Sequence, residues 1–213
     1  MHQNWHITPI TLIAVAAGFL CALLGHFLPF NDGLAVYTIE QIQALWLLFC
    51  SLYFSQQFLK ARPNKQNHYA VAWFAAMWWL LLGRSMAWGR DYFPELPHHY
   101  FRPIAIVLIA APLVLLCLPQ TRQQLKRLIQ RFHWPMWVCL AIFCFFVVSQ
   151  VVESERMFQR LPPFINPDRR DLIEELFEMP FMMLLFWVNR QCYLQDATLK
   201  NTQASAQQFW VKH

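Results

Sequence analysis

The stretch that decides the fold is YAVAWFAAMWWLLLGRSMAWGRD, residues 69–91. Its first part is apolar without interruption up to Leu82, and Arg84 follows close behind. A helix needs about 20 mostly apolar residues to cross the hydrocarbon of a bilayer, so the stretch predicts a span over 69–88. At helical spacing Arg84, Trp88 and Asp91 fall on one face. Because an ionisable side chain in lipid is costly unless it is paired or reaches water, we expect a polar site at this end of the span.

The composition extends the membrane prediction to the whole chain. Hydrophobic residues make up 57% of the 213 residues and charged residues only 14%. Several apolar runs are close to the length of a span, and none alternates with period two as barrel strands do. We therefore expect one all-α polytopic membrane domain over 1–213, a helix bundle with about six transmembrane helices and a flexible tail at 195–213. The spans are expected near 7–30, 35–59, 69–88, 103–119, 134–152 and 172–194.

Basic residues predict the orientation. With six spans both termini lie on one side, and the loops and tail of that side carry nine Lys and Arg residues against six on the other. An excess of basic residues marks the cytoplasmic side. We expect cytoplasmic termini and cytoplasmic loops around Lys65 and Arg127. The segment 120–132 has the pattern of a basic amphipathic helix that rests on the inner leaflet.

Acidic residues gather under the opposite surface. A carboxylate stripe with spacing i, i+3, i+4 and i+7 consists of Asp171, Glu174, Glu175 and Glu178. Asp171 has the alternative role of a helix cap in water. At 1.5 Å per residue Glu178 lies roughly 10 Å further in, near the depth expected for Arg84 and Glu40. We predict that Arg84 pairs with Glu178 or Glu174 and that Glu40 competes for it, because a buried charge without a partner is destabilising.

These residues define the predicted site. The candidate catalytic residues are Glu174, Glu178 and Asp91, and the candidate substrate-binding residues are Arg84, Trp88, Arg90 and Glu40. An enzyme acting on a lipid or a lipid-linked substrate would use one carboxylate as general base and an arginine to hold an anionic group. A small transporter would protonate Glu178 instead. An accessory or scaffold subunit would use the same residues as a structural network, so three classes of function stay open.

The sequence favours membrane lipids as partners, together with a second membrane protein or a second copy of the chain. No nucleic-acid partner is expected, because the basic residues lie in short loops. The loop residues Glu95, His98 and His99 offer metal ligands, but no HExxH motif accompanies them, so we expect neither a metal nor a cofactor. The six cysteines are expected to act as small apolar side chains. The proline-rich loop 161–170 is expected to lie over the site.

Two short stretches resemble a loosely defined group of uncharacterised bacterial multi-pass inner-membrane proteins. That group carries a Gly-x-Glu-x-Ser-Trp-Gly-(Gln/Arg)-Arg-like motif at the end of a span and a later Glu-Glu-x-x-Glu span. The matching positions are Gly83, Trp88, Gly89, Arg90, Glu174, Glu175 and Glu178, whereas Ser85 and Ala87 replace the acid and the serine of the motif. The resemblance implies a bacterial inner-membrane location and brings no activity with it.

Overall fold

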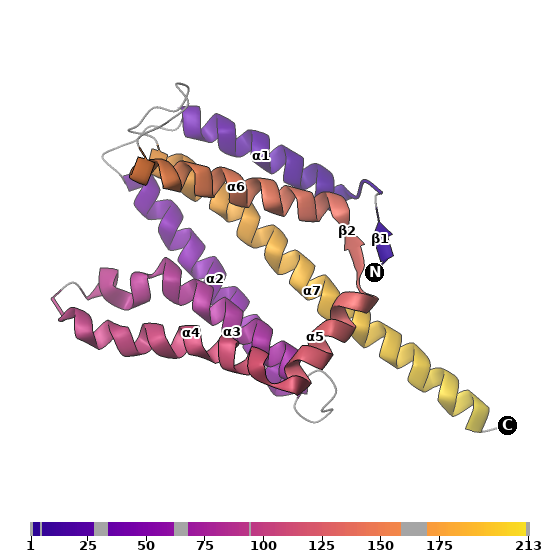
Figure 1. Ribbon diagram of the computed structural model, residues 1–213. Helices are drawn as coiled ribbons and strands as arrows, with labels where there is room; N and C mark the ends of the chain where they lie inside the picture. Colours follow the sequence, from indigo (N-terminus) through magenta and orange to yellow (C-terminus); the bar gives the residue numbers. More distant parts are fainter. Residues whose placement is uncertain are drawn as a thin grey trace. The chain divides into compact units, whose positions relative to one another are not determined.

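The structure is a computed structural model that describes residues 2–4, 6–27, 34–61, 68–93, 95–158 and 170–211. These residues are almost entirely helical, which confirms the predicted all-α class. Figure 1 labels the α-helices α1 (Pro9–Phe27), α2 (Leu34–Ala61), α3 (His68–Ser85), α4 (Phe101–Cys117), α5 (Pro119–Arg131), α6 (Met136–Phe158) and α7 (Arg170–Val211). The shorter elements are the 3-10 helices η3 (Ala87–Tyr92) and η4 (His98–Tyr100) and the paired strands β1 (His2–Asn4) and β2 (His133–Pro135).

The chain folds into two compact units. Unit 1 contains residues 1–2, 48–134 and 186–213, and unit 2 contains residues 3–47 and 135–185. The division cuts through α2 and α7, so each of these helices supplies its first part to unit 2 and its second part to unit 1. The loop 161–170 of the sequence prediction lies outside the described residues, apart from Arg170 at the start of α7.

Unit 1 has an aromatic core. Phe54 of α2, Trp78 of α3 and Phe186 of α7 are buried, and Trp78 is only 1% exposed. The rings of Phe54 and Trp78 stack with centroids 6.3 Å apart, and Phe186 forms a T-shaped pair with each of them at 5.9 and 6.0 Å. Aromatic pairs of this kind contribute about 0.5–1.5 kcal/mol each beyond the burial of their area. They hold α2, α3 and α7 together within this unit.

Helix α3 ends at Ser85, so the prediction that Arg84, Trp88 and Asp91 share one helical face is wrong. The backbone leaves the helix because Ala87, Trp88 and Gly89 have φ values of 44°, 63° and 94°, in the left-handed region. Non-glycine residues rarely adopt that region. Nothing but Gly89 signals this turn in the sequence.

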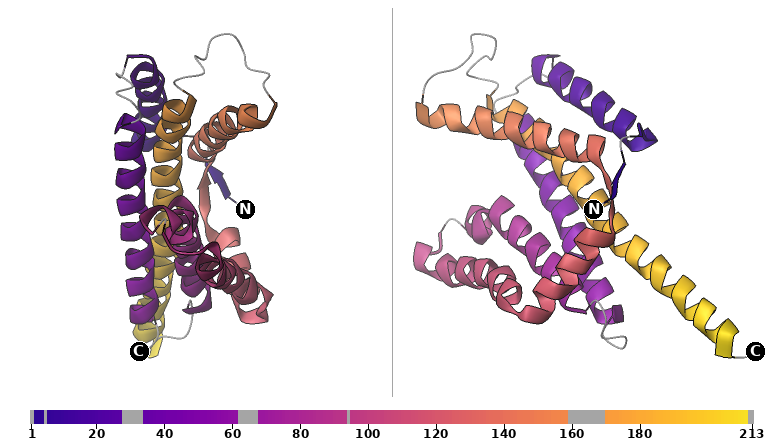
Figure 2. Two further views of the ribbon diagram at one scale, coloured as in Figure 1. Left: turned by 90° about the vertical axis from the view of Figure 1, so that its left-hand side faces the viewer. Right: turned by 45° about the vertical axis from the view of Figure 1, so that its right-hand side comes forward.

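The turn after α3 brings the next helix back alongside it. A Cβ on Gly83 would lie 3.1 Å from the Trp88 ring and 2.6 Å from Cδ1 of Leu108. Glycine at this position therefore allows the indole and a leucine of α4 to reach the α3 backbone. As a result α3 and α4 pack side by side (Figures 1 and 2).

Helix α5 follows α4 after a bend of 79°. Pro119 stands in the first turn of α5, a position that suits proline because no intrahelical N–H bond is needed there. The face that α5 buries contains Thr121, Gln124, Leu125 and Leu128, and its basic residues are exposed. The predicted amphipathic helix is thus confirmed. The Gln124 side chain accepts the backbone N–H of Ala70 at 3.0 Å, which satisfies a donor in the first turn of α3.

Unit 2 packs α1 against α6 and against the first part of α7. A Cβ on Gly18 of α1 would lie 3.2 Å from the Phe145 ring of α6. A Cβ on Gly25 would lie 2.9 Å from Ile173 of α7. Close helix contacts through small residues are typical of bundles in membranes, where van der Waals packing drives association.

Among the described residues, two helices, α1 and α2, are long and apolar enough to cross a membrane, and the bent pair α4–α5 is a third if it forms one span. Each of the six predicted spans overlaps one helix, but the number six is not confirmed. His68 and Arg84 lower the hydropathy of α3, and the carboxylates of the first turns lower that of α7. In α6 the apolar part is Met136–Val152, which is shorter than a full span.

The predicted flexible tail at 195–213 is helical as far as the structure describes it. Helix α7 continues to Val211. Residues 195–211 contain neither glycine nor proline, and Ala, Leu, Lys and Gln are good helix formers. These residues therefore extend the helix that begins at Arg170.

Candidate functional site

The carboxylates of unit 2 gather at the start of α7. The charges of Glu178, Glu40 and Glu174 all act on the carboxyl group of Glu175, so these three carboxyl groups lie within electrostatic range of Glu175. Glu40 is exposed on α2, whereas the three residues of α7 are half-buried. The structure thus brings together three of the predicted site residues, and it places Glu175 among them.

Buried neutral side chains surround this cluster. Ser149 of α6, 2% exposed, donates its hydroxyl to Oε1 of Glu178 at 3.3 Å. Gln43 of α2, also 2% exposed, donates its side-chain amide to the backbone carbonyl of Glu175 at 2.8 Å. Buried polar groups are normally hydrogen-bonded in this way. Helices α2 and α6 each fix one residue of the carboxylate stripe.

A proline explains why a side chain of another helix bonds to the backbone of α7. Pro180 lies inside α7 and has no N–H, so the carbonyl of Leu176, four residues earlier, lacks its intrahelical donor. The thiol of Cys21 in α1 donates to this carbonyl at 3.0 Å. Leu172, Leu176 and Cys21 form the centre of a buried apolar cluster. The bond lets the proline stand next to the carboxylates without leaving a buried carbonyl unsatisfied.

The remaining predicted residues belong to unit 1. Arg84 and Arg90 are exposed, at the end of α3 and in η3. Trp88 is half-buried over Gly83. Asp91 lies in η3, and its side chain is outside the described part of the structure. The pairing of Arg84 with a carboxylate of α7 stays a prediction.

An apolar groove lies beside the carboxylate stripe within unit 2. Its volume is about 460 Å³. The walls come from α1 and α6 and from one residue of α7, and the lining is Thr11, Ala14, Val15, Gly18, Phe19, Ala22, Trp137, Leu140, Ala141, Cys144, Phe145 and Phe177. Phe177 directly precedes Glu178 and follows Glu174 at i+3. Among the described residues, Phe177 is thus the one lining residue from α7, and none of the four carboxylates lines the groove.

Histidines, cysteines and acids are the side chains that could bind a metal ion. Among the described residues, no group of three or more His, Cys, Asp or Glu side chains could hold a metal ion. Glu95 and His99 are exposed, and the six cysteines are free thiols. What the described site offers chemically is a set of carboxylates and neutral hydrogen-bonding groups next to an apolar groove.

Sequence reasoning missed Gln43, Ser149 and Cys21. Gln43 and Ser149 are polar residues inside otherwise apolar runs, and this could have marked them as facing the bundle. Pro180 could have indicated a carbonyl that needs a donor. The cysteine that provides this donor is 155 residues away in the sequence, and no local pattern identifies it.

In the part of the chain that the structure describes, fold and site define an all-helical protein with two or three helices able to cross a membrane and a carboxylate cluster at a proline-containing helix. No protein-family model, curated protein or solved structure matches the chain.

Proposed function

We propose that the protein is a multi-pass membrane protein, with up to six spans, that binds a lipid or a lipid-linked molecule in unit 2. Support comes first from the apolar side chains that α1 exposes. Monomeric soluble proteins rarely expose large contiguous apolar patches. The exposed residues of α1 include Leu12, Ile13, Val15, Phe19, Leu20 and Leu23.

The observation that carries the proposal is that the groove reaches α7 at Phe177, in the stretch of the helix that also carries Glu174 and Glu178. A carbon chain would lie along α1 and α6, where the lining is almost entirely apolar. The polar part of the ligand would then reach Glu174 and Glu178 on the adjoining turn of α7. Ionised carboxylates only accept hydrogen bonds, so the favoured ligand carries hydroxyl or amino groups at the end of a lipid chain.

An enzyme would use this arrangement as follows. Glu178, held by the hydroxyl of Ser149 at 3.3 Å, acts as general base on a hydroxyl or a water near the head of the bound lipid. The carboxylate of Glu174, one turn earlier, positions the substrate by accepting a second hydrogen bond from it. The binding role predicted for Arg84, Arg90 and Trp88 stays a separate prediction for unit 1. The location proposed is the inner membrane of a bacterium, with both termini in the cytoplasm.

One observation favours a second candidate function, that of an accessory subunit. Gln43 and Cys21 donate to carbonyls of α7 and so stabilise the helix itself. A purely structural role would need no ligand at the carboxylates. The experiment below separates the two functions because only the first requires occupancy of the groove.

The groove can be tested with a phospholipid that carries a photoreactive group in one acyl chain, in nanodiscs containing the full chain. We expect cross-links to Leu140 and Cys144 in the groove to fall several-fold in the variant Ala22→Phe, which fills it. The matched control is Ala16→Phe, because Ala16 is exposed on α1 but does not line the groove. Equal labelling of the groove in all three proteins would reject lipid binding there.

The catalytic part needs its own comparison. In the enzyme, Glu178→Gln keeps groove labelling and changes the mass of a co-purified lipid relative to the unaltered protein, since conversion stops while binding continues. In an accessory subunit the same change leaves the lipid composition as it was. Lipid mass spectrometry on the two purified proteins distinguishes these outcomes.

A further inference from the structure

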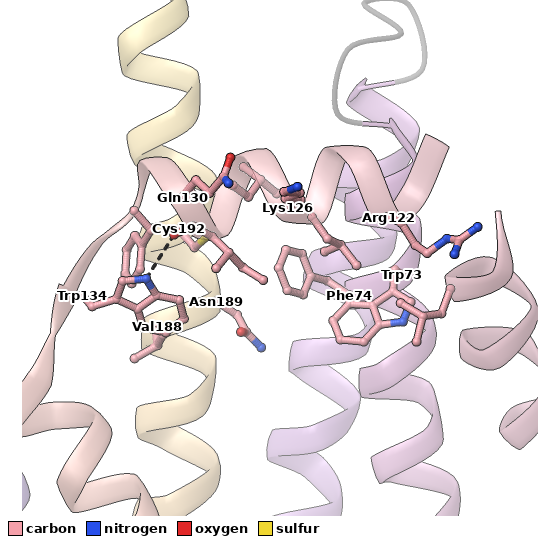
Figure 3. A pocket seen from close by; sticks show the side chains of 14 residues that line it. Trp73, Phe74, Arg122, Lys126, Gln130, Trp134, Val188, Asn189 and Cys192 are labelled. Atoms are coloured by element: carbon pink, nitrogen blue, oxygen red, sulfur yellow. Dashed lines mark hydrogen bonds between the residues drawn. The ribbon is translucent and has the colours of Figure 1, made fainter. Parts of the chain in front are cut away.

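A second, separate pocket lies within unit 1 (Figure 3). Its volume is about 610 Å³, within the range of roughly 300–1,000 Å³ that is usual for small-molecule sites. Helices α3, α4, α5 and α7 and strand β2 all contribute side chains. The apolar part of the lining is Trp73, Phe74, Leu116, Leu125, Leu128, Ile129, Phe132, Trp134 and Val188, with Cys192 beside it.

The polar lining of this pocket is cationic on one edge. Arg122, Lys126 and Gln130 follow one another at i+4 intervals along α5, so they form a row on one face of that helix. Figure 3 shows the three side chains along the helix that closes the pocket. The fourteen lining residues include these two cations and no acid. An anion at this edge would meet only favourable charges within the lining.

The opposite wall is held in place by a hydrogen bond. The indole Nε1 of Trp134 donates to the backbone carbonyl of Ile129 at 3.1 Å, drawn as the dashed line in Figure 3. The ring of Phe132 meets Trp134 edge to face with centroids 5.1 Å apart. A fixed aromatic wall reduces the ordering that a ligand would otherwise have to impose on binding.

We propose that this pocket binds an anionic lipid, with one acyl chain among the aromatic side chains and the anionic headgroup on Arg122 and Lys126. A free phosphate would use the two cations but not the apolar walls, and a neutral lipid would use the walls but not the cations. An amphipathic basic helix also lies at the depth of the lipid headgroups when it rests on a membrane. Helix α5 therefore places both cations where an anionic headgroup would be.

This inference is independent of the proposed function. The pocket lies in unit 1 and takes an anion, whereas the carboxylates and the groove lie in unit 2. A negative result for the pocket of unit 1 leaves the proposal for the groove of unit 2 unaffected, and the reverse also holds. The lipid bound here would act as a structural or regulatory ligand of the chain.

The probe for this site is phosphatidylglycerol with a brominated acyl chain, added to the full chain in neutral detergent micelles. Bromine quenches indole fluorescence only on contact, and Trp73 and Trp134 line the pocket. The measurement uses a Trp137→Phe background, because Trp137 lines the groove of unit 2. In that background we expect saturable quenching that is lost on the further change Trp73→Phe/Trp134→Phe. Brominated phosphatidylcholine, which has no net charge, should bind much more weakly. Quenching that survives in the double variant would place the lipid elsewhere and overturn the proposal.

Charge variants on α5 supply the matched control. The change Arg122→Gln/Lys126→Gln should weaken phosphatidylglycerol binding about 30-fold, since each cation near an anionic headgroup contributes on the order of fivefold. Arg127→Gln removes the same charge from the same helix, but Arg127 is exposed, does not line the pocket and donates to its own helix at Gln123. Its effect should stay below about twofold. Equal losses in both proteins would mean diffuse attraction to α5 and would refute a pocket site.

Filling the pocket tests the acyl chain. Ile129 and Leu116 line the pocket and are 42% and 40% exposed, so Ile129→Phe/Leu116→Phe adds bulk without disturbing a buried core. We expect this variant to lose phosphatidylglycerol binding. The control Val114→Phe enlarges an exposed residue of the same helix α4 outside the lining. Unchanged binding in the filled protein would show that only the headgroup is bound.

Discussion

The hydrogen bond between Cys21 and the carbonyl of Leu176 leads to a specific prediction about Pro180. The thiol matters because Pro180 provides no N–H for this carbonyl. If Pro180 is replaced by alanine, the helix supplies the missing donor itself. The change Cys21→Ala should then cost less in the Pro180→Ala background than in the unaltered protein.

The magnitude follows from the bond and its surroundings. Both Cys21 and Leu176 are 8% exposed, so the carbonyl cannot readily turn to water when the thiol is lost. A buried hydrogen bond contributes about 0.5–1.5 kcal/mol, and bonds between membrane helices average about 0.6 kcal/mol. The small cavity left by the sulfur costs the same in both backgrounds and cancels. We therefore expect a coupling free energy of about 1 kcal/mol between the two positions.

The assay is a double-mutant cycle by reversible unfolding in mixed micelles, with the free energy of unfolding measured for the unaltered protein, both single variants and the double variant. Cys21→Ser serves as a control, because a hydroxyl keeps a donor at this position and should recover part of the loss. Strict additivity of the two single changes would refute the reasoning. So would a Cys21→Ser protein as unstable as Cys21→Ala.

Three further predictions concern unit 1 and the topology. Gly83→Ala should lower the free energy of unfolding by about 1–3 kcal/mol, because its Cβ would lie 2.6 Å from Leu108, and a calorimetric scan measures this. Gln124→Leu should lower it by about 1 kcal/mol through loss of the bond to the Ala70 N–H, with amide exchange of the first turn of α3 as the local readout. A single cysteine at position 65, replacing Lys65 in a protein without its own cysteines, should not react with an impermeant reagent in intact cells; rapid labelling would reverse the proposed orientation.

The helix positions could be predicted from the sequence because each apolar run is bounded by polar residues or prolines. Helix α5 could be predicted as well, since its basic and apolar residues alternate with helical period. The turn after Ser85 could not, because Ala87 and Trp88 are ordinary helix residues that adopt left-handed angles only where the indole can pack over Gly83. At this turn, tertiary packing overrides the local helix propensity of Ala87 and Trp88.

The candidate site also depends on contacts between helices that the sequence does not reveal. The spacing predicts the carboxylate stripe, and in the structure Glu174, Glu178 and Glu40 lie within electrostatic range of Glu175. The helix that carries the stripe is fixed through its backbone, at two neighbouring carbonyls, by Gln43 and Cys21. These partners come from α2 and α1 and depend on which helices meet, which a single sequence does not reveal. The sequence narrows the function to three classes of protein that would use carboxylates in a membrane: an enzyme, a transporter and an accessory subunit.

The choice of neutral donors has a consequence for the carboxylates themselves. An arginine or lysine bonded to the carbonyls of α7 would tie the position of the helix to the charge state of the nearby glutamates. Cys21 carries no charge in its bond, so it holds the carbonyl of Leu176 whether the nearby carboxyl groups are ionised or protonated. Gln43 is also neutral, and besides the carbonyl of Glu175 it bonds the side chain of the same residue. Helix α7 can therefore keep its place while Glu174 or Glu178 gains a proton or meets a ligand. Such a fixed support serves a general base, a proton carrier and an accessory subunit alike.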